Sequence, residues 1–189
     1  MPSRREFLRA GGILAAGLFI TNRASASPAI QSGGDSIVEI HMESDIMGSH
    51  VWFDPVGILI EPGQTVRWVC IENVHTVTAY HPSNGNHSLR IPEKAAPWDS
   101  GFLQPGDRFE HTFTEEGVYD YFCLPHEGAG MVGRIVVGKP LGSGTLPFDY
   151  YKGNPASADW LPVPPAARTT FPSVERIMKE KIVRIGSTE

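Results

Sequence analysis

The sequence predicts an all-β protein, a Greek-key β-sandwich with a proline-rich C-terminal extension that ends in a short helix. Between residues 36 and 138, short runs rich in Val, Ile, Phe, Tyr and Trp alternate with turn residues. No helical interval separates these runs, which favours a sandwich or a barrel. The 20 glycines and 16 prolines among 189 residues are typical of a loop-rich β protein. The length suits one domain with extensions.

The N-terminus has the pattern of a targeting segment that takes no part in the fold. Residues 3–8, Ser-Arg-Arg-Glu-Phe-Leu, resemble the twin-arginine export signal, and an apolar run follows over residues 11–20. Ala24-Ser25-Ala26 then fits a cleavage pattern, so we expect residues 1–26 to be removed and the protein to be periplasmic. The alternative is a retained N-terminal anchor, for which the apolar run is short.

Removal of this segment would change the charge of the chain. It takes away four arginines and one glutamate and leaves 12 basic and 20 acidic residues, a net charge of −8. An acidic protein repels nucleic acid and anionic lipid and attracts basic protein patches. Nor does the sequence contain 18 consecutive apolar residues. We therefore expect no nucleic-acid partner and no stable membrane insertion after cleavage.

After a flexible lead-in over residues 27–35, the strand pattern begins at residue 36. The expected strands cover residues 36–42, 49–53, 57–61, 65–71, 75–81, 107–113, 117–123 and 131–138.

Three turns and one long connection separate these strands. Pro62-Gly63 and Pro105-Gly106 fit the central positions of type II turns, because proline sets φ and glycine accepts a positive φ. Residues 115–117, Glu-Glu-Gly, close a third turn. Residues 82–106 are too long for a simple hairpin, and such loops are often functional. Within this connection, we expect Trp98 to pack back onto the body of the protein.

The β pattern stops after residue 138. Residues 139–172 contain seven prolines, which predicts an extended tail. Residues 173–185 have the pattern of a helix. One helical stripe holds Val174, Ile177, Met178 and Ile182. This helix either docks on its own sandwich, the simpler interpretation, or binds a partner.

The segment from Cys123 to Met131 concentrates metal-binding chemistry. Cys123 ends an expected strand, and His126 and Met131 follow at short spacing. A lone buried cysteine is usually a small hydrophobic residue. Here the intervening Leu-Pro and Glu-Gly-Ala-Gly can form a tight loop that brings thiolate, imidazole and thioether to one point. Together with a second imidazole, these groups form the ligand set of a blue-copper site, which favours electron transfer over bond-making chemistry.

The run Cys-Leu-Pro-His-Glu-Gly-Ala-Gly-Met over residues 123–131 resembles the copper loop of plastocyanins and is similar to those of pseudoazurins and halocyanins. Residues 132–137 resemble the closing strand of that fold, and residues 53–55 and 60–66 resemble its second and third strands. The resemblance covers about residues 36–138. It implies the cupredoxin fold with one type 1 copper ion, whose ligands are His75, Cys123, His126 and Met131.

The chain departs from the family pattern around two of these ligands. The family usually has Pro before the first histidine ligand and Asn after it, where this chain has Val74 and Thr76. The backbone N–H after that histidine commonly bonds the copper thiolate, and the main chain of Thr76 can donate the same bond. Plastocyanins place Tyr before the copper cysteine, whereas Phe122 holds that position here, which argues against a second, tyrosine-linked docking route.

The surroundings of the loop predict how electrons leave the site. His126 is flanked by Leu124, Pro125 and Ala129, so we expect its ring edge to reach the surface through an apolar patch. Such a patch suits transient redox encounters.

The remaining cysteine and histidines receive simpler interpretations. We expect Cys70 to be a buried free thiol, because a disulfide would consume the thiolate that the metal needs. His81 and His87 suggest a second metal site only as a minor alternative. The others are expected to be structural or surface residues: His41, His50 and His111.

The favoured function is a periplasmic electron carrier. Its expected partners are redox proteins such as c-type cytochromes, membrane oxidoreductase complexes or terminal reductases and oxidases. The alternatives are copper delivery or storage, and a copper subunit of a larger redox complex. A multicopper enzyme is not expected, because the sequence has no His-x-His pair and room for only one such domain.

Overall fold

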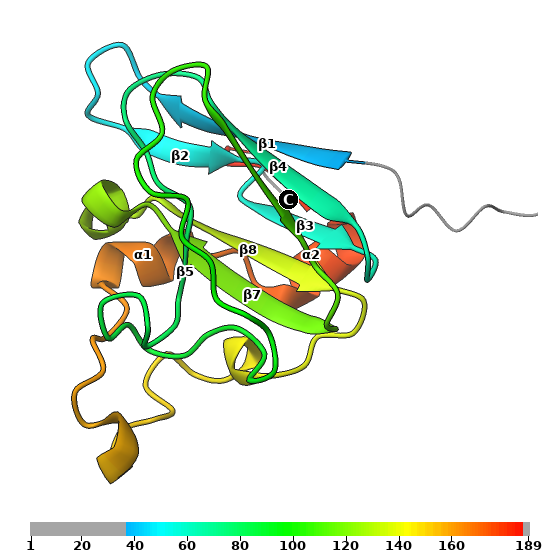
Figure 1. Cartoon of the computed structure of the whole chain (residues 1–189), viewed down its shortest axis with the longest axis vertical. Helices are drawn as coiled ribbons and strands as arrows, with labels where there is room; N and C mark the ends of the chain where they lie inside the picture. The colour runs from blue at the N-terminus through cyan, green and yellow to red at the C-terminus, as the bar shows by residue number, and fades with distance from the viewer. Residues whose placement is uncertain (1–36, 187–189) are drawn as a thin grey trace, which may run out of the picture. The chain divides into compact units, whose positions relative to one another are not determined.

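The computed structural model describes residues 37–186 (Figure 1). The predicted signal segment over residues 1–26 and the lead-in over residues 27–35 lie outside the described residues.

Two β-sheets form the body of the protein, as the sequence predicts (Figure 1). The four-stranded sheet has the order β2-β1-β4-β6, and the five-stranded sheet has the order β5-β7-β8-β3-β9. Both sheets are mixed, because β1 runs parallel to β4 and β3 runs parallel to β8. The first sheet comprises β1 (Ile37–Ser44), β2 (Val51–Asp54), β4 (Thr65–Cys70) and β6 (Arg108–Thr112). The second comprises β3 (Gly57–Ile60), β5 (Thr78–Ala79), β7 (Gly117–Phe122), β8 (Val132–Val137) and β9 (Ile182–Val183).

The core between the sheets is rich in aromatic rings. Trp68 from β4 meets Tyr121 from β7 edge to face, with ring centroids 5.4 Å apart. Trp98 is buried against the same tryptophan at 6.3 Å, so the long connection does pack back on the body as predicted. Large buried rings of this kind contribute much of the hydrophobic stabilisation of a small sandwich.

The two Pro-Gly turns are confirmed, because Gly63 and Gly106 have φ values of +92° and +94°. The predicted strand over residues 75–81 is wrong for most of its length, since only β5 is regular there. The main chain of this segment bonds in turn to different neighbours: His75 pairs with Leu103, and Ala79 donates to Trp98. One continuous ladder cannot form when successive residues have different partners.

The C-terminal extension is more structured than predicted. Residues 139–172 are not simply extended, because helix α1 (Pro165–Thr170) lies within them, along with two short 3₁₀ turns, η2 (Ser143–Thr145) and η3 (Pro155–Ser157). The predicted final helix is shorter, as α2 (Val174–Glu180), and Ile182 belongs to β9 instead. Neither helix, nor any other among residues 37–186, has the length and hydropathy needed to cross a membrane.

The extension packs on the outer face of the five-stranded sheet. Ile177 of α2 is buried against Val118 and Val136, and Ala167 of α1 is buried against Phe122. In Figure 1 both helices lie beside β8. Helix α2 therefore docks on the sandwich of its own chain. Every residue of β7 and β8 is buried, because one face of these strands lines the core and the extension packs on the other.

A buried cluster of one carboxylate and two guanidinium groups binds the extension to this face. The carboxylate of Asp120 accepts hydrogen bonds from Arg90 and Arg134, both at 2.7 Å, and all three side chains are buried. The same guanidinium groups donate to tail carbonyls, Arg90 to Gly144 and Arg134 to Pro172, each at 2.9 Å. One carboxylate thus orients two arginines that hold two separate parts of the tail.

We expect Asp120→Asn to lower the free energy of unfolding by about 3–5 kcal/mol, because two buried guanidinium groups would lose their counter-charge. Denaturant unfolding of the metal-free protein measures this change. The matched control is Asp149→Asn, which removes an exposed pair with Lys152 and should cost at most about 1 kcal/mol. Similar losses of unfolding free energy in the two variants would show that the buried cluster stabilises the fold no more than an exposed ion pair does.

Candidate metal centre

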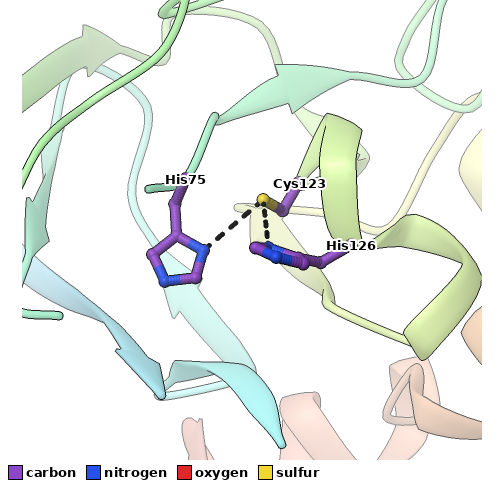
Figure 2. Close-up of side chains that lie close together, drawn as sticks. All are labelled: His75, Cys123 and His126. Atoms are coloured by element: carbon purple, nitrogen blue, oxygen red, sulfur yellow. Dashed lines mark hydrogen bonds between the residues drawn. The ribbon is translucent and has the colours of Figure 1, made fainter. Parts of the chain in front are cut away.

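Three side chains from two distant parts of the sequence, His75 and the pair Cys123 and His126, meet just beyond the end of β7 (Figure 2). The Sγ atom of Cys123 lies 3.6 Å from Nδ1 of His75 and 3.3 Å from Nδ1 of His126. One potential ligand atom of each residue lies within 4.8 Å of the others. Figure 2 shows both imidazole rings turned toward the sulfur. The sequence predicted this convergence, although 48 residues separate His75 from Cys123.

Main-chain hydrogen bonds shape the loop between Cys123 and Met131. His126 N–H donates to the Cys123 carbonyl at 3.0 Å, at the start of the 3₁₀ helix η1 (Leu124–Ala129), whose N-cap is Cys123. Gly130 ends the turn in the left-handed conformation, with φ +89°. Cys123 N–H then donates to the Met131 carbonyl at 3.0 Å. The loop is thus closed at its base, in continuation of the β7–β8 ladder.

The second imidazole is held by the long connection. His75 N–H donates to the Leu103 carbonyl at 3.1 Å, and the reverse bond is 2.8 Å long. The next residue, Thr76, donates its N–H to Cys123 Sγ at 3.4 Å, which confirms the predicted main-chain bond. Its hydroxyl also accepts a bond from Leu124 N–H at 2.7 Å, which the sequence did not reveal. Thr76 therefore bonds both the cysteine and the loop that follows it.

The fourth predicted ligand, Met131, lies at the closing end of the loop. Its side chain is fully buried among the core residues, and its N–H donates to the His126 carbonyl at 3.1 Å. Its main chain therefore bonds both Cys123 and His126.

Burial sets the protonation of the site. It lowers the pKa of His75 to about 4, with the neighbouring His126 adding to the effect, and it lowers the pKa of His126 as well. Burial also raises the pKa of the Cys123 thiol to about 11, against the opposing bond from Thr76 N–H. At neutral pH the site therefore presents two neutral imidazoles and a thiol. This uncharged set can accept a cation if the thiol gives up its proton.

The donor types and the burial fit a soft, imidazole-binding metal ion. Nε2 of His75 is buried and has no hydrogen-bond partner among the described residues. The other nitrogen of this ring, Nδ1, is the one that faces the sulfur. Such a burial of polar groups is costly unless they find a partner. The sulfur of Cys123 and the two Nδ1 atoms are the donors that could hold such an ion, and Nε2 of His75 is not one of them.

One member of the site is accessible from outside. His126 is partly exposed, whereas His75 and Cys123 are buried. Exposed Leu124, Pro125 and Ala129 flank it, as the sequence predicted.

The other cysteine and histidines stay outside the centre. Both cysteines are free, and Cys70 donates its S–H within the turn that precedes His75, to the Asn73 carbonyl at 3.4 Å. The ring of His81 bonds Ser83. Among residues 37–186, only the cluster of His75, Cys123 and His126 brings such donor atoms together, so the structure gives no support to a second site at His81 and His87.

Sequence reasoning missed one group beside the centre. The carboxylate of Glu127, directly after His126, bonds the Tyr80 hydroxyl at 2.6 Å and lies 3.2 Å from Nε2 of His87. No local pattern could reveal this cluster, because at least 40 residues separate Glu127 from each partner.

Comparisons with known proteins agree with this geometry. The profile of the family described as "Copper binding proteins, plastocyanin/azurin family" matches residues 40–138, about half of the chain. A chloroplastic plastocyanin of Tetradesmus obliquus is 30% identical over 144 residues, which cover 71% of this chain and 83% of that protein. A plastocyanin of a Synechococcus strain is 32% identical over 132 residues, 67% of this chain and 84% of that one.

Among solved structures, a pseudoazurin from Sinorhizobium meliloti superposes with a TM-score of 0.52 at 25% identity. The match covers 76% of this chain and 94% of that one. The fold, the Cys-His-His cluster and the sequence match lead to one conclusion: this chain belongs to the plastocyanin/azurin family of copper-binding proteins.

Proposed function

We propose that this protein is a periplasmic electron carrier, which exchanges one electron at a single type 1 copper held by His75, Cys123, His126 and Met131. The observation that carries the proposal is the approach of two imidazole Nδ1 atoms to one buried cysteine sulfur, at 3.3 and 3.6 Å, in a copper-binding fold. A thiolate, two imidazoles and a weak axial thioether let copper cycle between two oxidation states and suit electron transfer.

The residues around the proposed ligands limit how far the ligands can move. Cys123 is fixed at the end of β7 by its bond to Met131, and its sulfur also accepts a bond from Thr76 N–H. His75 is held by two main-chain bonds to Leu103. Because these bonds hold the ligands in place, the ligands would move little when the copper gains or loses an electron. Burial of His75, Cys123 and Met131 keeps water away from the sulfur atoms.

The accessible edge of His126 supplies the route for the electron. Exposed Leu124, Pro125 and Ala129 around it form a small apolar surface, where a partner can approach closely and leave quickly. We propose that the partners are redox proteins, such as c-type cytochromes, membrane oxidoreductase complexes or terminal reductases and oxidases. The twin-arginine-like segment at residues 3–8 supports a periplasmic location.

Substitution of Cys123 by serine tests the ligand assignment. We expect the Cu(II)-loaded protein to show the intense visible absorption of a copper–thiolate bond, and Cys123→Ser to abolish it. The matched control is Cys70→Ser, because Cys70 is a second buried free thiol in the same core and should leave the band in place. A band that survives in Cys123→Ser would refute the assignment. Slow redox cycling of the wild type with ready copper transfer to an acceptor would instead indicate copper handling.

The protonation of the metal-free site predicts the pH dependence of copper binding. At pH 7 both histidines are neutral and Cys123, with a pKa of about 11, is a thiol, so binding should release about one proton. The affinity should therefore rise about tenfold for each unit of pH near neutrality. Anaerobic calorimetry with Cu(I) in two buffers of different ionisation enthalpy measures the proton count. Release of no proton would show that Cys123 is already ionised or is not a ligand.

A further inference from the structure

The carboxylate of Glu127, which is not a proposed ligand, holds the ligand loop through contacts with two side chains outside that loop. Glu127, the residue after His126, accepts a hydrogen bond from the Tyr80 hydroxyl on one carboxylate oxygen at 2.6 Å. Its other oxygen lies 3.2 Å from Nε2 of His87. Tyr80 is fully buried, and the side chains of His87 and Glu127 are only 8% and 14% exposed. Both oxygens of the carboxylate therefore have a partner in a largely dry environment.

The His87 ring lies between two hydrogen-bond acceptors, a geometry that favours its protonated form. Its Nδ1 lies 2.6 Å from the Asn84 carbonyl oxygen, and its Nε2 faces the Glu127 carboxylate. Both neighbours are acceptors, and only an imidazolium can donate to both of them at once. Although burial lowers the pKa of His87, the bonds to Glu127 and Asn84 raise it overall. A charge-assisted bond in this setting is stronger than a neutral one.

The C-terminal extension holds His87 in place. Leu161 N–H donates to the Asn86 carbonyl at 2.7 Å, and Ser88 N–H donates to the Leu161 carbonyl at 3.2 Å. The residues on either side of His87 are thus paired with the tail. The ring of His87 also stacks on Phe122, with centroids 4.3 Å apart, directly before Cys123.

The same extension supports the far end of the loop. A Cβ atom at Gly130 would lie 2.9 Å from Thr170 Oγ1 and 3.2 Å from the Ala166 carbonyl oxygen. The backbone of the loop therefore packs directly on α1, with no room for a side chain. The loop between Cys123 and Met131 is fixed from two sides by residues that lie beyond the strands of the sandwich.

We propose that Glu127 is a positioning residue for the copper ligand His126, held by Tyr80 and by a tail-supported His87, and that the C-terminal extension is thereby part of the metal site. The inference rests on the proposed function, because it takes His126 to be a ligand. Glu127 touches no ligand atom and acts through the main chain that it shares with His126. Its bonds limit the orientations of the loop, and hence of the imidazole, before and after copper binds.

The test compares Glu127→Gln with Glu116→Gln, a control in which the carboxylate forms an exposed pair with Lys139. Loss of a group bonded directly to a metal ligand typically weakens metal binding 10- to 100-fold, and because Glu127 acts on His126 through the main chain we expect the lower end of that range. We expect Glu127→Gln to release copper to a chelator about tenfold faster or more, and to change the copper hyperfine coupling in the electron paramagnetic resonance spectrum. The control should change neither.

A second variant tests whether Tyr80 acts through the same carboxylate. Tyr80→Phe removes one bond to the same carboxylate, so its effect on copper release should not add fully to that of Glu127→Gln in the double variant. Wild-type release rates and spectra in Glu127→Gln would overturn the inference. So would a loss of stability in the metal-free protein with an unchanged hyperfine coupling, since that indicates a structural role alone.

The proposed function and this inference fail in different ways. If wild-type protein shows no copper–thiolate absorption, or Cys123→Ser keeps it, the ligand assignment fails. If wild type shows the band and Cys123→Ser loses it, while the Glu127 variant behaves as the control does, only the positioning role fails.

Discussion

The antiparallel pairing of β7 with β8 determines both where the metal ligands meet and which face the C-terminal extension covers. Side chains alternate along both strands, so Tyr121 and Cys123 point into the sandwich while Asp120 and Phe122 point outward. The chain passes from one strand to the next through the short turn η1, closed by the bond from Cys123 N–H to the Met131 carbonyl. The connection between the two strands thus brings the imidazole of His126 to the sulfur of Cys123 and pairs the main chains of Cys123 and Met131.

The same alternation explains why a tail is built onto this domain. The outer faces of β7 and β8 carry large apolar side chains, which are costly to expose to solvent. They also carry the carboxylate of Asp120, which is costly to bury against an apolar layer without a partner. Arg90 and Arg134 satisfy the carboxylate of Asp120, and their remaining donors bind carbonyls of the extension. The extension therefore shields the apolar side chains of this face from solvent and supplies hydrogen-bond partners to its arginines. Its path across that face also brings it to the ligand loop, where α1 meets Gly130.

Local patterns in the sequence predicted much of this arrangement. Alternating apolar residues and the Pro-Gly turns located most of the strands, and the spacing of Cys123, His126 and Met131 located the loop. His75 was found through resemblance to a family, because no local pattern links it to Cys123. The parts that were missed depend on distant contacts. A six-residue helix such as α1 is too short to show a period among prolines, and the bonds of Glu127 join residues that lie in separate segments.

We expect the fold to place the donor atoms before the metal binds and to hold them there in both oxidation states. Crystal structures of the metal-free, Cu(I) and Cu(II) forms, in one crystal form, test it most directly. We expect Sγ of Cys123 and Nδ1 of His75 and His126 to shift by less than about 0.5 Å among the three structures. A metal-free form in which the loop after Cys123 is rearranged, or in which the ring of His75 turns away from the sulfur, would contradict it.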